Sequence, residues 1–219
     1  GECEVVLREV DEEDWSESWK KYYKPFYITE GVVVKPSWEK WLPEKDELVI
    51  ELDPGMAFGT GTHDTTRMCA VLVRKYLKKG DRVLDVGCGS GILSILSALL
   101  GAEKVEAVDI DPVAVDAARE NCAINGVEDL VNVRAGVISD INEGKFNLIV
   151  ANIIADIIID IAGDVLKRLL PGGIFITSGI IKEREREILE KYSGLGFKTV
   201  LTDRSGEWVA IVFRCPDSL

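Results

Sequence analysis

The sequence feature that most constrains the fold is a glycine-rich turn at residues 85–91, with the sequence DVGCGSG. A short apolar stretch leads into it, and an apolar stretch of helical length, residues 92–100, follows it. Glycine allows a backbone to turn sharply and to approach a ligand closely. The next apolar stretch, residues 104–108, ends at Asp109, whose carboxylate can accept hydrogen bonds from a ribose diol. Strand, glycine turn, helix and acid together predict a βα unit that binds a nucleoside.

The spacing of the glycines distinguishes between two classes of nucleoside cofactor. Dinucleotide sites favour G-x-G-x-x-G, whereas Gly87, Gly89 and Gly91 follow G-x-G-x-G. Asp85 stands two residues before the first glycine, where an acid would repel a pyrophosphate but would help to hold a cation. S-adenosyl-L-methionine carries a sulfonium, an amino group and no phosphate. The loop therefore favours this methyl donor over a nicotinamide, and a tight turn without any ligand is the remaining alternative.

Alternating strand and helix patterns predict an α/β fold. We expect strands at residues 83–86, 104–108, 130–135, 146–151, 174–178, 198–202 and 208–214, and helices at residues 63–79, 92–100, 111–125, 155–170 and 182–192. Such alternation implies a mostly parallel, doubly wound, Rossmann-like sheet with helices on both faces. The last two strands are joined by a short turn and must be antiparallel. A seven-stranded sheet with one antiparallel strand near the C-terminus is the arrangement of class I methyltransferases.

Composition excludes several classes of protein. No apolar run approaches the ~20 residues that span a bilayer. The net charge of −12, half of it within the first 50 residues, argues against direct nucleic-acid binding and is compatible with a basic partner. Five cysteines without a C-x-x-C pair indicate free thiols in a reducing compartment, so we expect a cytoplasmic protein.

The segment before the glycine turn is rich in glycine and threonine and suits the wall of a ligand site. It reads LDPGMAFGTGTHDTT at residues 52–66, and we expect Thr62 to cap the helix that follows. His63 is the only histidine of the chain, and it is a candidate general base, although capping or packing would also explain it. Phe58 is a candidate to cover the adenine or to pack within the loop.

Asn152 ends a predicted strand at the edge of the sheet where open α/β sheets bind ligands. Its amide can accept a hydrogen bond from a substrate amine and help to hold the cofactor; the alternative is a simple helix cap. The following residues, Ile153, Ile154 and Ala155, include neither the prolines nor the aromatic residue typical of methyltransferases that stack a flipped base. This corner therefore favours a flexible amine as the methyl acceptor, and the chemistry requires no metal.

Four segments together resemble the PrmA family of class I methyltransferases, which modify a large-subunit ribosomal protein. They are LDPGMAFGTGTHDTT, DVGCGSGILSI, AVDIDPVAV and ANIIA. The resemblance implies methylation of lysine ε-amines and of the N-terminal α-amine. It also implies that Thr66, Gly87, Asp109 and Asn152 bind S-adenosyl-L-methionine. At Asp64 the family usually has proline, a departure with little chemical meaning.

The resemblance also implies a ferredoxin-like N-terminal domain that recognises the ribosomal substrate through a linker. We expect residues 1–50 to be the linker and a remnant of that region, and residues 51–219 to be the catalytic domain. Within the first part we expect a strand at residues 4–10, a helix at residues 11–23 and a hairpin at residues 26–35. Two alternatives remain: a methyltransferase for another protein lysine or a small-molecule amine, and a NAD-dependent oxidoreductase.

Overall fold

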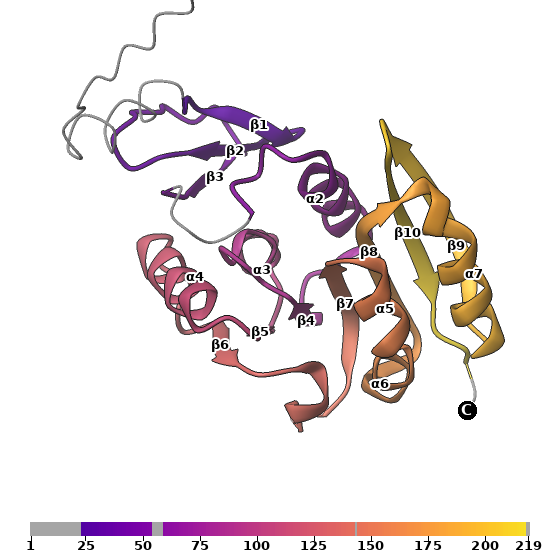
Figure 1. The fold of residues 1–219 in the computed structure, drawn as a ribbon. Helices are drawn as coiled ribbons and strands as arrows, with labels where there is room; N and C mark the ends of the chain where they lie inside the picture. Colours follow the sequence, from indigo (N-terminus) through magenta and orange to yellow (C-terminus); the bar gives the residue numbers. More distant parts are fainter. Residues whose placement is uncertain (1–22, 54–58, 143, 218–219) are drawn as a thin grey trace, which may run out of the picture.

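A computed structural model describes residues 23–53, 59–142 and 144–217, which form a seven-stranded and a three-stranded sheet (Figure 1). The larger sheet consists of β4 (Arg82–Val86), β5 (Lys104–Asp109), β6 (Val131–Ala135), β7 (Phe146–Asn152), β8 (Leu169–Ile181), β9 (Lys198–Ser205) and β10 (Trp208–Arg214). Its strand order is β6-β5-β4-β7-β8-β10-β9. Strand β10 runs antiparallel to both of its neighbours, and the other pairs are parallel. The predicted fold class is confirmed.

Helices cover both faces of this sheet. They are α2 (Asp64–Tyr76), α3 (Ile92–Leu99), α4 (Pro112–Ile124), α5 (Ala155–Asp160), α6 (Ala162–Arg168) and α7 (Glu185–Gly194), with single 3-10 turns at Ile138–Asp140 and Lys182–Arg184. Side chains of α2, α3 and α4 belong to one buried apolar cluster, and those of α5, α6 and α7 belong to a second. Neighbouring residues of one strand point into different clusters, as Val83 and Leu84 do, because side chains alternate across a sheet.

The three-stranded sheet consists of β1 (Phe26–Thr29), β2 (Val32–Lys35) and β3 (Leu48–Glu51). Strands β1 and β2 form the predicted hairpin, and β3, which the sequence analysis did not predict, pairs in parallel with β2. Ile28, Val34 and Ile50 are buried in the same cluster as the side chains of α2 and α3. The small sheet therefore packs on these two helices (Figure 1). The strand and helix expected before residue 23 lie outside the described residues.

Two predicted helices are wrong in detail. The helix expected at residues 155–170 breaks at Ile161 and ends at Arg168, because Leu169 pairs with Phe146 of β7 and so belongs to β8. Helix α2 begins at Asp64 and is capped by His63, not by Thr62. The end of the first helix is set by strand pairing with a distant part of the chain, which a local pattern does not report. The cap of α2 is a local contact between His63 and Thr65.

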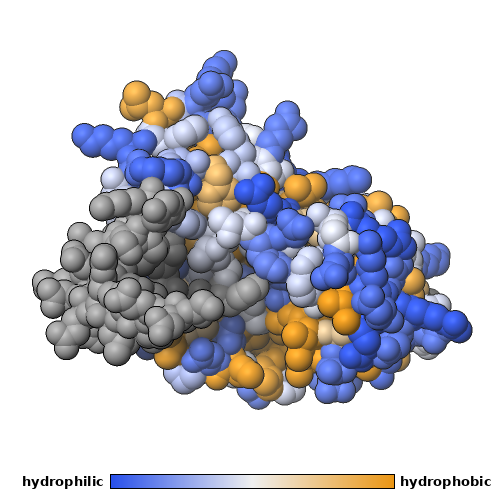
Figure 2. Space-filling view, turned by 45° about the horizontal axis from the view of Figure 1, so that its top comes forward, coloured by the Kyte–Doolittle hydropathy of each residue, from blue (hydrophilic) through white to orange (hydrophobic). Residues whose placement is uncertain are grey.

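Hydrophilic residues (blue) cover much of the coloured face seen in Figure 2, with groups of hydrophobic residues (orange) between them. None of the helices in the described parts of the chain is long and apolar enough to cross a membrane.

Candidate functional site

A cavity of about 800 Å³ lies at the carboxyl ends of β4, β5 and β7. It brings together five of the predicted site residues, His63, Gly87, Gly89, Asp109 and Asn152. Parallel strands that end at the same edge of a sheet place the residues that follow them side by side, which explains why positions distant in sequence meet here.

The three glycines of the turn are required by the backbone and by close packing. Gly87, Gly89 and Gly91 have φ angles of 73°, 53° and 80°, in the left-handed region that glycine tolerates best. A Cβ atom on Gly87 would lie 2.3 Å from Cγ2 of Ile153, and one on Gly91 would lie 3.1 Å from Cβ of Ala118. A larger residue at Gly87 would therefore displace one wall of the cavity.

Asp109 is the only charged side chain among the described residues that line the cavity, apart from the titratable His63. Its Oδ2 accepts a hydrogen bond from the amide of Gly89 at 2.9 Å, and its Oδ1 accepts one from the amide of Asp111 at 3.0 Å. Each carboxylate oxygen can accept a further hydrogen bond. The carboxylate is thus held in place by backbone groups and still has capacity for a ligand.

Asp85 is buried next to the glycine turn and does not line the cavity. Its Oδ2 accepts a hydrogen bond from the hydroxyl of Ser94 at 2.6 Å, and its Oδ1 has no partner within the described residues. Burial and, to a smaller extent, the charge of Asp109 together raise the pKa of this carboxyl group from 3.8 to about 7, against the lowering effect of the hydrogen bonds from Ser94. A buried carboxylate with an oxygen lacking a partner is suited to a nearby positive charge.

Asn152 lines the cavity, and Thr66 fixes its orientation from outside it. The amide nitrogen of Asn152 donates to the hydroxyl of Thr66 at 3.2 Å, and Thr66 is buried in α2. Within the described parts of the chain no partner is seen for the amide oxygen of Asn152. This oxygen is therefore available to accept a hydrogen bond from a molecule in the cavity.

His63 caps α2 and also lines the cavity. Its Nδ1 accepts a hydrogen bond from the amide of Thr65 at 3.3 Å and lies 2.8 Å from the hydroxyl of the same residue. The imidazole ring contacts the ring of Trp208 edge to face, with 5.1 Å between the centroids. His63 therefore caps a helix and packs against an aromatic ring, as the alternatives to a catalytic role predicted. It also lies in the cavity lining, where a general base would have to lie. Phe58 lies outside the described residues.

Much of the remaining lining was not identified from the sequence. Ile153, Ile154, Ile157 and Ile161, which we call the isoleucine wall, line the cavity around α5, and Trp208 lines it from the start of β10. Ile154 is 63% exposed and Ile157 is 43% exposed. A sequence signal for this wall did exist, because isoleucines on several faces of one short helix exceed what a single buried face requires.

The cavity fits a nucleoside cofactor with a positive charge. Its volume lies within the range of ~300–1,000 Å³ usual for ligand sites, and its lining is mostly apolar with a few polar groups. The lining includes no lysine or arginine among the described residues, so the charges nearby favour a cation over a phosphate.

Comparison with known proteins gives one family. The family model for ribosomal protein L11 methyltransferase (PrmA) matches residues 1–216. A relative of that name from Acetivibrio thermocellus is 57% identical over 219 residues, which is 100% of this chain and 70% of the relative.

Solved structures agree with this match. The structure of ribosomal protein L11 methylase from Lactobacillus delbrueckii subsp. bulgaricus is 34% identical, with a TM-score of 0.83 over 89% of this chain and 100% of that chain. An RNA methyltransferase from Salinibacter ruber in complex with S-adenosyl-L-homocysteine shares the fold, at 18% identity and a TM-score of 0.57 over 69% of this chain and 92% of that chain.

Proposed function

Because the chain belongs to the ribosomal protein L11 methyltransferase (PrmA) family and uses S-adenosyl-L-methionine, we propose that it methylates lysine ε-amines and the N-terminal α-amine of ribosomal protein L11. The observation that carries this proposal is the meeting of Asp109 and Asn152 in one apolar cavity. The first supplies an acceptor for a ribose, and the second supplies an amide oxygen for an amine.

We assign the cofactor to the glycine side of the cavity. Gly87 and Gly89 allow the nucleoside to approach the backbone, and Asp109 accepts hydrogen bonds from the ribose. Asp85 balances the positive charge of the ligand through the buried carboxylate. Thr66 and Asn152 act as one hydrogen-bonded pair at the methionine end. Phe58 belongs to the same proposed site by its place in the sequence.

The cofactor, when bound, supplies a methyl group on a sulfonium, so that an amine lone pair can form the C–N bond while the C–S electron pair remains on sulfur. The work left to the chain is positioning and the exclusion of water. Asn152 would accept one N–H of the acceptor amine and thereby aim the nitrogen lone pair. The isoleucine wall would keep water away from the reacting atoms.

The acceptor amine must lose a proton before it reacts. A lysine ε-amine has an ordinary pKa of ~10.4, and an apolar surrounding lowers the pKa of an amine because it disfavours the charged form. His63 lies in the cavity lining and is our candidate to receive the proton.

Residues before position 51 are proposed to connect the catalytic domain, residues 51–219, to a substrate-recognition region. The curated relatives are longer than this chain, which spans 67–70% of their length. The net charge of −12 favours encounter with a basic ribosomal protein. A cytoplasmic location is part of the proposal, because the proposed substrate is a ribosomal protein.

Mass spectrometry of ribosomal protein L11 tests the proposal. The protein is incubated with S-adenosyl-L-methionine and either this chain or a chain extended to the length of its relatives, with Asn152→Ala as a comparison that should methylate more slowly. We expect methyl additions on lysines and on the N-terminus with the extended chain. The proposal would be contradicted if other atoms of ribosomal protein L11 were methylated, or if the extended chain did not methylate the protein at all. Cofactor binding without methylation of ribosomal protein L11 would favour a different amine substrate.

A further inference from the structure

Helix α4 contacts both the proposed cofactor site and the three-stranded sheet. At its beginning, the amide of Asp111 donates to Oδ1 of Asp109 at 3.0 Å. In its middle, Ala118 lies so close to Gly91 that a Cβ on that glycine would be 3.1 Å away. Past its end, Asn125 is hydrogen-bonded to β3. Helix α4 and its two capping residues therefore connect the proposed cofactor site to the three-stranded sheet.

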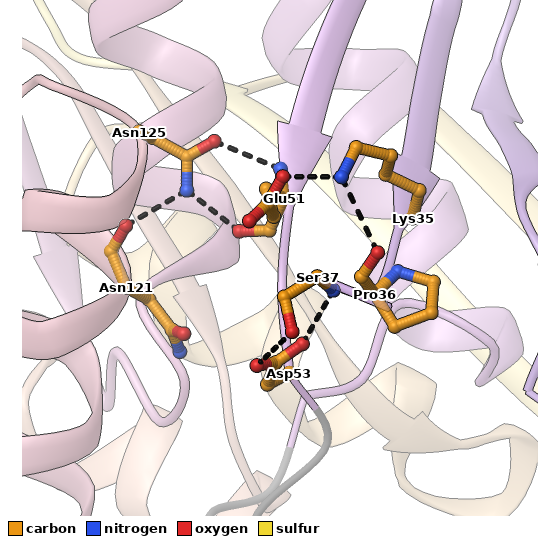
Figure 3. A network of polar contacts seen from close by, with 7 residues as sticks. All are labelled: Lys35, Pro36, Ser37, Glu51, Asp53, Asn121 and Asn125. Atoms are coloured by element: carbon orange, nitrogen blue, oxygen red, sulfur yellow. Dashed lines mark hydrogen bonds and ion pairs between the residues drawn. The ribbon is translucent and has the colours of Figure 1, made fainter. Parts of the chain in front are cut away.

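The contact of Asn125 with β3 imitates the pairing of a neighbouring strand. Its Oδ1 accepts from the amide of Glu51 at 2.9 Å, and its Nδ2 donates to the carbonyl of the same residue at 2.7 Å (Figure 3). Strand β3 is an edge strand of the three-stranded sheet, so this side chain satisfies backbone groups that a further strand would otherwise satisfy. The same Nδ2 also donates to the carbonyl of Asn121 at 2.7 Å.

Asn121 continues the connection to the glycine turn. Its side chain is buried, and its Nδ2 donates to the carbonyl of Ser90 at 2.9 Å. Ser90 lies between Gly89, whose amide is bonded to Asp109, and Gly91, which packs on Ala118. A shift of Asn121 would therefore move the part of the turn that faces the nucleoside.

Strand β3 and the residues that follow it have two further polar contacts, with β2 and with the segment after β2. Lys35 of β2 forms an ion pair with Glu51, and Ser37 donates to both carboxylate oxygens of Asp53, from its amide at 2.7 Å and from its hydroxyl at 2.8 Å (Figure 3). A displacement of the small sheet would thus be passed on to Asn125 instead of being absorbed at the end of the strand.

We propose that Asn121 and Asn125 are positioning residues that couple the three-stranded sheet through α4 to the cofactor turn. Neither side chain lines the cavity, yet both set the affinity for the cofactor. Coupling between two sites is reciprocal, so occupation of the cavity also stiffens β3. This inference rests on the proposed cofactor site and adds that residues leading into the catalytic domain sense whether that site is filled.

The first test measures binding of S-adenosyl-L-homocysteine by calorimetry, at a temperature where every variant is folded. Asn121→Ala and Asn125→Ala should each weaken binding about 3- to 10-fold, and the double variant should lose less than the product of the two. Glu120→Ala, an exposed change on the same helix, is the control and should bind as the unmodified chain does. A purely structural role would lower the melting temperature and leave binding at low temperature unchanged.

The second test measures hydrogen exchange of the Glu51 amide. We expect S-adenosyl-L-homocysteine to slow this exchange in the unmodified chain and to have less effect in Asn121→Ala, where the amide keeps its own partner. Asn125→Asp retains the oxygen that accepts from the Glu51 amide but loses the two hydrogen bonds that Nδ2 donates. This variant should therefore also bind S-adenosyl-L-homocysteine more weakly.

The outcomes separate the two proposals. If the unmodified chain does not bind S-adenosyl-L-homocysteine, the cofactor site itself is wrong. If the chain binds S-adenosyl-L-homocysteine but only Asn121→Ala weakens binding, the proposed coupling to the small sheet is wrong and the cofactor site is still supported. The same conclusion follows if the ligand does not change the exchange rate of the Glu51 amide.

Discussion

The glycine side of the cavity and the isoleucine wall are built in different ways. On the glycine side the contacts come from backbone groups and carboxylates at Gly87, Gly89 and Asp109, whose positions are fixed by hydrogen bonds and by the absence of side chains. The isoleucine wall offers apolar side chains in and beside the short helix α5, of which Ile154 and Ile157 are exposed. A single added methyl group should therefore disable the first region, whereas the second should tolerate changes that conserve volume.

The sharpest challenge to this contrast is Gly87→Ala. We expect it to weaken binding of S-adenosyl-L-homocysteine by more than roughly 100-fold, because a positive φ is strained by ~1–2 kcal/mol and the new methyl meets Ile153. Gly80→Ala is the matched control, since Gly80 has a φ of 88° and no atom within 4 Å of the added methyl. Equal effects of both variants on binding would show that packing against the wall does not matter.

Asp85 tests whether the glycine side reduces the stability of the fold. Its pKa is raised from 3.8 to about 7, so the unfolded chain releases this proton first as the pH rises, and the free energy of unfolding should fall by about 2–3 kcal/mol between pH 5 and pH 8. Asp85→Asn retains an acceptor for Ser94 and should remove this decrease while weakening cofactor binding. Denaturant titrations at the two pH values measure the free energy of unfolding. The assignment would be contradicted if the free energy of unfolding of Asp85→Asn decreased with pH as much as that of the unmodified chain.

Asp109→Ala should weaken cofactor binding by about 10- to 100-fold, since a hydrogen bond to a charged group contributes ~1.5–3 kcal/mol. Calorimetry with S-adenosyl-L-homocysteine measures the change. Asp116→Ala removes an exposed carboxylate of α4 and serves as the control for net charge. Unchanged affinity of the Asp109 variant would remove this residue from the site.

Asn152→Ala separates cofactor binding from substrate positioning. We expect kcat to fall about 10-fold or more, with a smaller change in cofactor Kd, because one hydrogen bond to the acceptor is lost in the reacting complex. Thr66→Val should produce part of the same loss, since it frees the amide that Thr66 orients. An equal loss in kcat and in cofactor affinity would show that Asn152 mainly binds the donor.

The isoleucine wall should give the smallest effects. Ile157→Leu conserves volume and should change cofactor Kd less than about 3-fold. Ile157→Ala should weaken binding about 3- to 10-fold, which corresponds to about one buried methylene group at ~0.8 kcal/mol, because the side chain is partly exposed. Binding isotherms for both variants measure the difference. A large loss of cofactor affinity in Ile157→Leu would show that the isoleucine wall is as sensitive to shape as the glycine side.

The sequence predicted the glycine side well and the isoleucine wall poorly, for a physical reason. Between Arg82 and Asp109 the strands, the turn and the helix each have local signals, so the pattern and the structure agree. Strand β3 and the start of β8 at Leu169 depend on pairing with β2 and β7, which lie elsewhere in the chain. Trp208 was predicted as part of a strand, but its place beside His63 arises only from the order of the strands in the sheet.

Strand β10 has a consequence for how the protein is made. It lies between β8 and β9, so β9 emerges from the ribosome before the strand that joins it to the sheet. Trp208, the first residue of β10, completes the cavity last of all its lining residues. The ligand site is therefore incomplete on every nascent chain, however far its glycine turn has folded, until the final strand has been synthesised and inserted.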